Sequence, residues 1–205
     1  MLLEIHPTNP DPRKVALVVE CLRDGGIVVY PTDTIYGLGC DITNARAVER
    51  VCKVKGVKPE KANFSFVCAS LSHISEYTAP IDTATYKLMR RTLPGAFTFI
   101  LKANNNVPKL FKNNKRTVGI RVPDNLIART LVEQLGNPLL STSLNAPDEV
   151  QAFYTDPSEI YDDYQNLVDI VIDGGNGGNV ASTVVDCTDG MPTVLRVGAG
   201  VVDWE

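Results

Sequence analysis

Residues 27–41 of this chain read Ile-Val-Val-Tyr-Pro-Thr-Asp-Thr-Ile-Tyr-Gly-Leu-Gly-Cys-Asp. The first four are apolar and partly β-branched, and they follow two glycines, which predicts a core strand ending at Pro31. Polar side chains then crowd into five positions, beside glycines that let the backbone approach another group closely; they are Thr32, Asp33, Thr34 and Tyr36. This junction is typical of a binding site, although an Asx-type turn that bonds only its own backbone gives the same pattern.

Helices are predicted on both sides of this strand. Asp11 precedes a proline and an apolar pattern of helical spacing, so we expect a helix that ends at Gly25. After the polar turn, Thr43 or Asn44 caps a second predicted helix. Two lysines stand at the C-terminal end of that helix, Lys53 and Lys55.

The rest of the chain predicts further helices and strands. Strands are expected at residues 63–69, 96–102, 117–122, 182–186 and 193–197, and helices at 82–91, from Asp124 to Gly136, and from Asp156. The apolar run 138–141 enters a polar loop, 141–145, and the glycine-rich stretch 174–178 predicts a hairpin turn rather than a phosphate loop. Helices and strands alternate before strands dominate, which favours an α/β fold with a mixed sheet in one domain spanning 1–205.

Composition indicates an ordinary globular protein. The chain has 205 residues, of which 44% are hydrophobic and 21% charged. Its five cysteines form no Cys-x-x-Cys pair, which suits a reducing compartment, and no export signal or long apolar span is evident, so we expect a cytoplasmic protein without a membrane segment. The two histidines, His6 and His73, are too far apart in sequence to suggest a zinc site. Any metal would be Mg²⁺ carried by a phosphate ligand.

Charge is divided unevenly along the chain. Residues 50–121 contain 14 Lys or Arg against three Asp or Glu, although the whole chain has a net charge of -4. This asymmetry favours a surface that faces a polyanion, or else lysines that scatter over several solvated faces once folded.

The polar groups suggest anion binding without a covalent nucleophile. We find no Gly-x-Ser-x-Gly elbow, no Walker P-loop and no paired His and Cys. Cations with hydroxyl and amide donors are suited to holding a phosphate or carboxylate. Arg121 lies inside an apolar strand, where it needs an anionic ligand, an ion pair with an Asp such as Asp33, or an edge position facing water.

Seven motifs occur in order over nearly the whole chain: Pro-Thr-Asp-Thr-Ile-Tyr-Gly-Leu-Gly at 31–39, Lys-x-Lys at 53–55, Pro-Gly at 94–95 before a strand with Thr-Phe at 98–99, Gly-Ile-Arg-Val-Pro at 119–123, Ser-Thr-Ser-x-Asn at 141–145, Ser-Thr-Val-Val-Asp at 182–186 and Leu-Arg-x-Gly-Ala at 195–199. Together they resemble the YrdC/YciO family. The opening Ile-His-Pro and the Ser-Thr-Ser-Leu stretch are most similar to its YciO branch.

The resemblance implies a twisted, open mixed sheet flanked by helices, with a basic concave face. It also implies an L-threonylcarbamoyladenylate synthase, which makes threonylcarbamoyl-AMP and pyrophosphate from L-threonine, bicarbonate and ATP for tRNA modification. By similarity, Thr34, Arg121 and Ser141 hold threonine, and Tyr36 shapes the pocket. The residues implied to hold the nucleotide are Lys53, Lys55, Thr117, Ser143, Asn145 and Arg196.

Two alternatives stay open. The basic tract 50–121 suits a groove for double-stranded RNA or tRNA, with binding dominated by phosphate contacts. A hydrolase of threonylcarbamoyl compounds would use the same pocket. The family's usual Lys-x-Arg is Lys53-x-Lys55 here, which replaces a planar fork with a point charge that orients phosphate less strictly.

Overall fold

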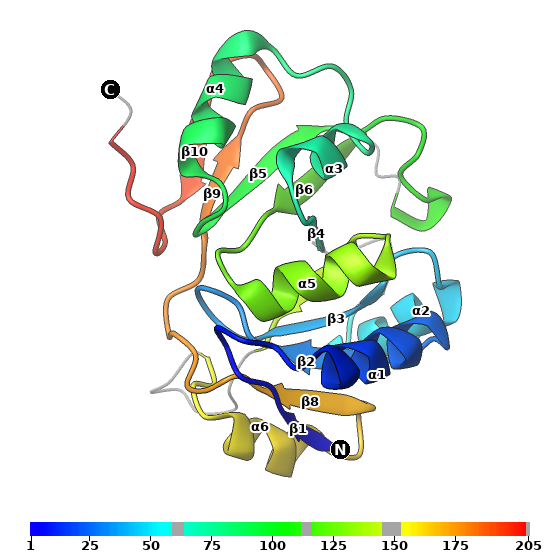
Figure 1. Ribbon diagram of the computed structural model, residues 1–205. Coiled ribbons are helices and arrows are strands. Elements are labelled where there is room, and N and C mark those ends of the chain that lie inside the picture. Colours follow the sequence, from blue (N-terminus) through cyan, green and yellow to red (C-terminus); the bar gives the residue numbers. More distant parts are fainter. Residues whose placement is uncertain (59–63, 112–115, 145–152, 204–205) are drawn as a thin grey trace.

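The computed structural model describes residues 1–58, 64–111, 116–144 and 153–203. In these residues ten strands form one sheet in the order β1-β8-β2-β3-β7-β4-β6-β5-β9-β10 (Figure 1). The strands are β1 (Leu2–Glu4), β2 (Val28–Tyr30), β3 (Gly37–Asp41), β4 (Ser65–Val67), β5 (Phe97–Lys102), β6 (Thr117–Arg121), β7 (Leu139–Ser143), β8 (Ile170–Asp173), β9 (Thr183–Asp186) and β10 (Thr193–Arg196). Parallel and antiparallel pairs alternate irregularly, which confirms the predicted α/β fold with a mixed sheet.

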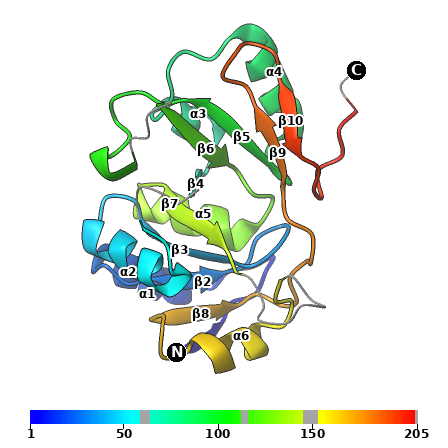
Figure 2. The ribbon, with the colours of Figure 1, turned by 180° about the vertical axis from the view of Figure 1, so that it is seen from behind.

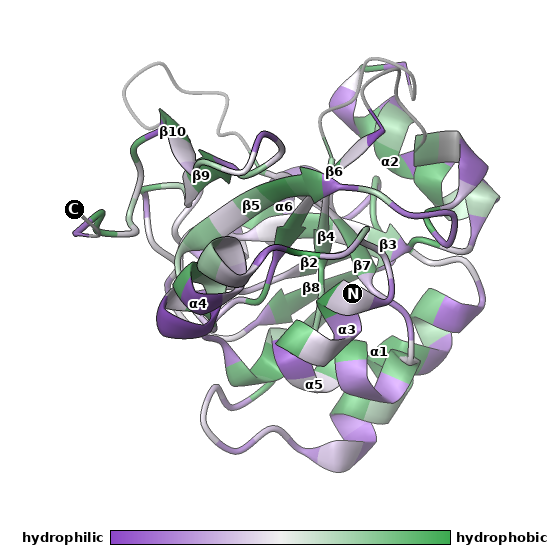
Figure 3. Ribbon diagram, turned by 90° about the horizontal axis from the view of Figure 1, so that it is seen from above, coloured by the Kyte–Doolittle hydropathy of each residue, from purple (hydrophilic) through white to green (hydrophobic). Residues whose placement is uncertain are grey.

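Helices cover both faces of the sheet (Figures 1 and 2). They are α1 (Pro12–Arg23), α2 (Ala45–Lys55), α3 (Leu71–Ser75), α4 (Thr83–Thr92), α5 (Leu126–Leu135) and α6 (Pro157–Tyr164), with a short 3-10 turn at Lys109–Phe111. The apolar sides of α1 and α5 share one buried cluster with Val28, Val67 and Leu139. The helices α2, α3, α4 and α6 contribute to the cluster on the opposite face. Seen from above, several helices carry alternating polar and apolar bands, as an amphipathic helix does (Figure 3).

Most helix starts follow the predicted capping residues. The side chains of Asp11, Asn44, Asp82 and Asp156 each accept a backbone N–H at the start of α1, α2, α4 and α6. The prediction that Asp124 caps the next helix is wrong, because Asn125 accepts the N–H of Ala128. The Asp124 carboxylate instead lies 3.7 Å from Arg129 at the surface.

Two loop predictions are also wrong. Ser141 and Ser143 lie within β7, where pairing to β3 continues to the end of the strand, so this stretch is not yet a loop. The glycines at 174–178 do not form a hairpin, since β8 pairs with β1 and β2 whereas β9 pairs with β5 and β10. They connect the two halves of the sheet.

The sequence did not predict β1, α3, β8 or β3. The last is the most consequential, because β3 contains the glycines of the opening motif and lies at the centre of the sheet. Gly39 has to lack a side chain: a Cβ would collide with the carbonyl oxygen of Leu140 and lie 2.9 Å from Cε1 of Tyr30.

Gly39→Ala should therefore destabilise the fold by about 1 to 3 kcal/mol, because the collision is with backbone in a central strand. Denaturant unfolding would measure the change. Gly119→Ala is the matched control, since a Cβ there meets its nearest atom at 3.6 Å, and we expect its unfolding free energy to stay within about 0.5 kcal/mol of the original. Equal losses in both variants would contradict this account.

Candidate functional site

A row of small residues crosses the centre of the sheet on the face that α1 and α5 cover only in part. The strand registers align Gly39 with Ser141, Ser141 with Ser65, and Ser65 with Gly119. Val67 and Leu139, further along the same face, are buried under the helices, whereas Ser65, Gly119 and Ser141 stay partly exposed. This part of the sheet can therefore accept a ligand against its strands.

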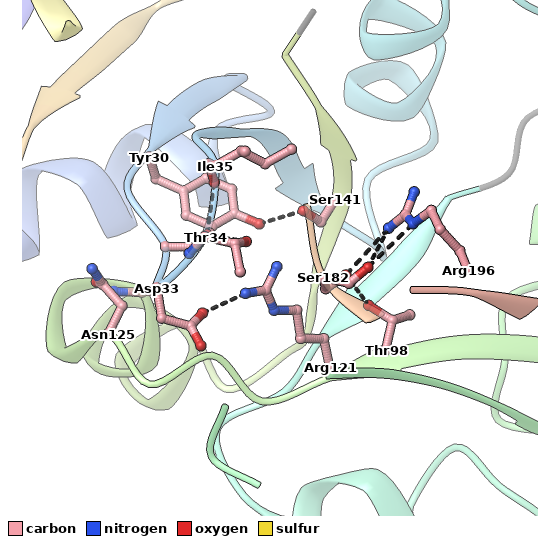
Figure 4. Close-up of polar contacts among 12 residues, drawn as sticks. Tyr30, Asp33, Thr34, Ile35, Thr98, Arg121, Asn125, Ser141, Ser182 and Arg196 are labelled. Atoms are coloured by element: carbon pink, nitrogen blue, oxygen red, sulfur yellow. Dashed lines mark hydrogen bonds and ion pairs between the residues drawn. The ribbon is translucent and has the colours of Figure 1, made fainter. Parts of the chain in front are cut away.

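Arg121 lies at the edge of this row, at the end of β6. The residue is 7% exposed, and its Nη2 donates to Oδ1 of Asp33 in an ion pair that is nearly enclosed (Figure 4). Of the alternatives that the sequence left open, the structure contains the ion pair with Asp33. The Nε of Arg121 is buried and has no hydrogen-bond partner. A buried donor without a partner costs about 1 to 3 kcal/mol.

The polar turn after β2 is closed by threonine rather than by aspartate. Oγ1 of Thr32 accepts the N–H of Thr34 at 3.1 Å and donates to the carbonyl of Ile35 at 2.7 Å. The hydroxyl of Thr34 is 3.1 Å from that of Thr32 and nearly buried. Because Thr32 closes the turn, the carboxylate of Asp33 is available to reach Arg121.

Tyr30 links the turn to the row of small residues. Its ring packs over Gly37 and Gly39, and its hydroxyl donates to Oγ of Ser141 at 2.6 Å. Burial raises the pKa of Tyr30 to about 12, while the hydrogen bond with Ser141 and the nearby charge of Arg121 oppose that rise. Figure 4 shows Tyr30, Thr34, Ser141 and the guanidinium of Arg121 gathered at one place.

Tyr36 lies on the other side of the sheet. It belongs to the opposite core cluster, and its hydroxyl donates to the carbonyl of Gly175 at 2.7 Å and accepts the N–H of Gly174. The N–H of Gly178 donates to the carbonyl of Thr34 at 2.6 Å. The glycine-rich segment 174–178 therefore holds the polar turn from outside, and Tyr36 supports that segment rather than joining the gathered side chains.

The two lysines of α2 point to different surroundings, as expected for positions about 200° apart around a helix. Lys55 donates to the carbonyl of Ser143 at 2.9 Å, which places it at the end of β7, and burial lowers the pKa of its ammonium group. Lys53 instead lines a surface cavity of about 450 Å³ beside Glu49 and Lys58.

A second polar group lies across β5, β9 and β10. Arg196 donates through Nε and Nη2 to the carbonyl of Ser182, whose hydroxyl lies 2.8 Å from that of Thr98 (Figure 4). Thr117 lies at the start of β6, on the same side as Gly119 and Arg121. Asn145 falls outside the described residues.

Sequence reasoning did not single out Tyr30, Ser182 or Thr98 as site residues. Ser182 and Thr98 were visible within motifs, but nothing in their spacing showed that they meet. Tyr30 was counted as part of an apolar run. A tyrosine at the end of a buried strand needs a hydrogen-bond partner for its hydroxyl, and this was the signal that could have identified it.

The basic residues of the tract 50–121 do not gather on one element. Among those described, Lys53 and Lys55 are on α2, whereas Lys87, Arg90 and Arg91 are on α4, which lies at the far end of the molecule (Figures 1 and 2). Arg50, also on α2, pairs with Asp169 at 2.8 Å.

All five cysteines are free thiols. Within the described ranges, no three or more His, Cys, Asp or Glu side chains gather closely enough to hold a metal ion. Searched over the same ranges, no helix is long and apolar enough to cross a membrane.

Comparison with known proteins gives the class. A family model that groups Sua5, YciO and YrdC proteins, described as telomere recombination, matches residues 20–198. The chain therefore belongs to the Sua5/YciO/YrdC family, which confirms the resemblance carried by the seven motifs.

Particular relatives divide into two groups. The chain is 44% identical over 199 residues to YciO of Escherichia coli K12, an uncharacterised protein, covering 97% of this chain and 95% of that one. It is 32% identical to the threonylcarbamoyl-AMP synthase of Bacillus subtilis, covering 92% of this chain but 54% of the synthase.

Solved structures agree with this division. The crystal structure of E. coli YciO superposes with a TM-score of 0.91 at 42% identity, covering 98% of this chain and 97% of YciO. The structure of Pyrococcus abyssi Sua5 in complex with L-threonine gives a TM-score of 0.85 at 27% identity, covering 97% of this chain and 57% of Sua5.

The buried tyrosine makes stability dependent on pH. The pKa of Tyr30 is about 10 in the unfolded chain and about 12 in the folded protein. The stabilisation that comes from this group is therefore fully present below pH 10 and is lost as the pH rises towards 12. The loss expected from this group is roughly 2 to 3 kcal/mol. Tyr30→Phe should flatten the fall when unfolding free energy is measured between pH 9 and 12.

Tyr154→Phe is not a suitable control, because burial raises the pKa of Tyr154 as well. Tyr86→Phe is suitable, since its side chain is exposed on α4, and it should leave the slope unchanged. An unchanged slope in Tyr30→Phe would contradict the buried hydroxyl.

Proposed function

We propose that this protein is a threonylcarbamoyl-AMP synthase that binds L-threonine beside Arg121 and ATP along the adjoining row of small residues. The observation that carries the proposal is the incompletely paired, buried guanidinium of Arg121 beside Thr34 and Ser141. A guanidinium group can donate two parallel hydrogen bonds to a carboxylate. Asp33 accepts from Nη2, which leaves other N–H groups of Arg121 for a ligand. The nearby hydroxyls suit a small polar ligand.

The phosphate end of the proposed site lies towards α2 and the C-terminal strands. Lys55 at the end of β7 and Arg196 beside Ser182 supply positive charge on either side of the row. Lys53, Thr117, Ser143 and Asn145 complete the set proposed to hold the nucleotide, with Mg²⁺ carried by the phosphates. These groups would position and neutralise phosphate.

The proposed chemistry needs no residue to form a bond with substrate. Threonine nitrogen takes up the carbon of bicarbonate with loss of water, and an oxygen of the resulting carbamate attacks the α-phosphorus of ATP. Pyrophosphate leaves, and threonylcarbamoyl-AMP remains for tRNA modification. The described cluster, rich in cations and hydroxyls, suits catalysis by positioning and charge neutralisation. The cytoplasm is the proposed location, which the five free thiols support.

The alternative of an RNA groove has weaker support from the arrangement of charge. A strip of phosphate contacts requires lysines and arginines on one continuous surface. The described basic residues of α2 and α4 lie on helices that are well apart, with α4 at the top and α2 at the side of the lower half in Figure 1. A hydrolase of threonylcarbamoyl compounds would use the same pocket, and the substrate assay below separates it from a synthase.

Incubation with ATP, bicarbonate and L-threonine tests the proposal, with pyrophosphate and threonylcarbamoyl-AMP followed while each substrate is omitted in turn. We expect pyrophosphate release that depends on all three. Release that continues without threonine or bicarbonate, or no release at all, would sink the synthase assignment.

Arg121→Lys tests the threonine site without leaving Asp33 unpaired, a loss that would destabilise the fold by about 3 to 5 kcal/mol in Arg121→Ala. Lysine keeps the positive charge but cannot donate two parallel hydrogen bonds to a carboxylate, so the KM for threonine should rise at least about tenfold. Arg129→Lys is the matched control, because Arg129 also pairs with an aspartate but lies on the outer side of α5. Equal kinetics for the two variants would count against the assignment.

A further inference from the structure

The ion pair between Arg121 and Asp33 makes the proposed amino-acid site electrically neutral before any ligand binds. The two side chains are 9% and 13% exposed, so water screens them poorly. One anion entering such a site would leave an uncompensated negative charge, which is costly away from water. A ligand that carries both charges leaves the site neutral.

The pair also has binding capacity for both charges of one ligand. On the guanidinium, Nε is without a partner. On the carboxylate, Oδ1 accepts from Arg121, and within the described residues no hydrogen bond or ion pair is found for Oδ2. One ion pair therefore contains both an unpaired donor and an unpaired acceptor oxygen. An α-amino acid has its carboxylate and ammonium on the same carbon, which matches this juxtaposition.

The sequence of the turn is consistent with such a role. Thr32 closes the turn through its own hydroxyl, and Asp33 accepts no backbone N–H within the turn. The carboxylate is therefore not needed to stabilise the turn itself. The position of the Asp33 carboxylate instead depends on the neighbouring residue Thr34, whose carbonyl accepts a hydrogen bond from the N–H of Gly178.

We propose that Asp33 is a specificity-determining residue that makes the site select zwitterionic amino acids over simple carboxylate anions. The inference rests on the proposed function for the location of the amino acid, and it extends that function by assigning the ammonium group to Asp33. Asp33 acts by neutralising Arg121 and by accepting from the ammonium group of the ligand. Removing its charge leaves a net positive site, which binds a plain carboxylate better.

Calorimetric titration of the full chain tests this with two ligands: L-threonine, and 2,3-dihydroxybutyrate of matching configuration, in which a hydroxyl replaces the ammonium. The unaltered protein should bind the hydroxy acid at least about tenfold more weakly than threonine. In Asp33→Asn this preference should fall to about threefold or less, mainly through tighter binding of the hydroxy acid. Asp162→Asn, an exposed aspartate on α6, is the matched control and should keep the original preference.

Equal affinity of the unaltered protein for the two ligands, or binding of neither at millimolar concentration, overturns the proposal even if Asp33→Asn does not fold. So does an unchanged preference in a folded Asp33→Asn. Asp33→Glu, which keeps the charge, should keep the preference, and its loss there would contradict a charge-based role.

The result is separable from that of the pyrophosphate assay. Zwitterion preference that disappears in Asp33→Asn, without pyrophosphate release, would leave the inference standing and remove the synthase reaction. Release that depends on all three substrates, without zwitterion preference, would do the reverse.

Discussion

The centre of this fold depends on the packing of Tyr30 over two glycines. Its ring occupies the space that side chains on Gly37 and Gly39 would fill, and its hydroxyl reaches Ser141 two strands away. This contact ties β2, β3 and β7 together at the point where the polar turn leaves the sheet. The positions of the turn, of Asp33 and of the small-residue row follow from it. A larger residue at either glycine would displace the tyrosine and with it the hydroxyl that orients Ser141.

Sequence reasoning predicted the elements whose signals are local. Caps at Asp11, Asn44, Asp82 and Asp156 give helix starts, because the capping hydrogen bond involves residues only two or three positions apart. The predicted core strands also have their own apolar patterns. The strand β3 was missed for the opposite reason: Gly37 and Gly39 have low intrinsic strand preference, and their pairing with β2 and β7 overrides it.

The candidate site was predictable as a list of residues but not as an arrangement. The motifs named Thr34, Arg121 and Ser141, which the structure brings together. They also named Tyr36, which lies on the other face, and the pairing of Arg121 with Asp33 was one of three open alternatives. Which face a side chain takes depends on strand register, and register depends on partners about 100 residues away in sequence. No local pattern contains that information.

The glycine-rich segment 174–178 has a consequence for the order in which the molecule forms. The segment follows β8 in one half of the sheet and leads to β9 in the other, and it bonds to the carbonyl of Thr34 and the hydroxyl of Tyr36. The polar turn is encoded early in the chain, yet it gains this support only after residue 178 has been synthesised. Strand neighbours distant in sequence make folding slow. During translation the turn lacks this outer support until residue 178 has been made, so the proposed amino-acid site can be completed only after most of the chain has been synthesised.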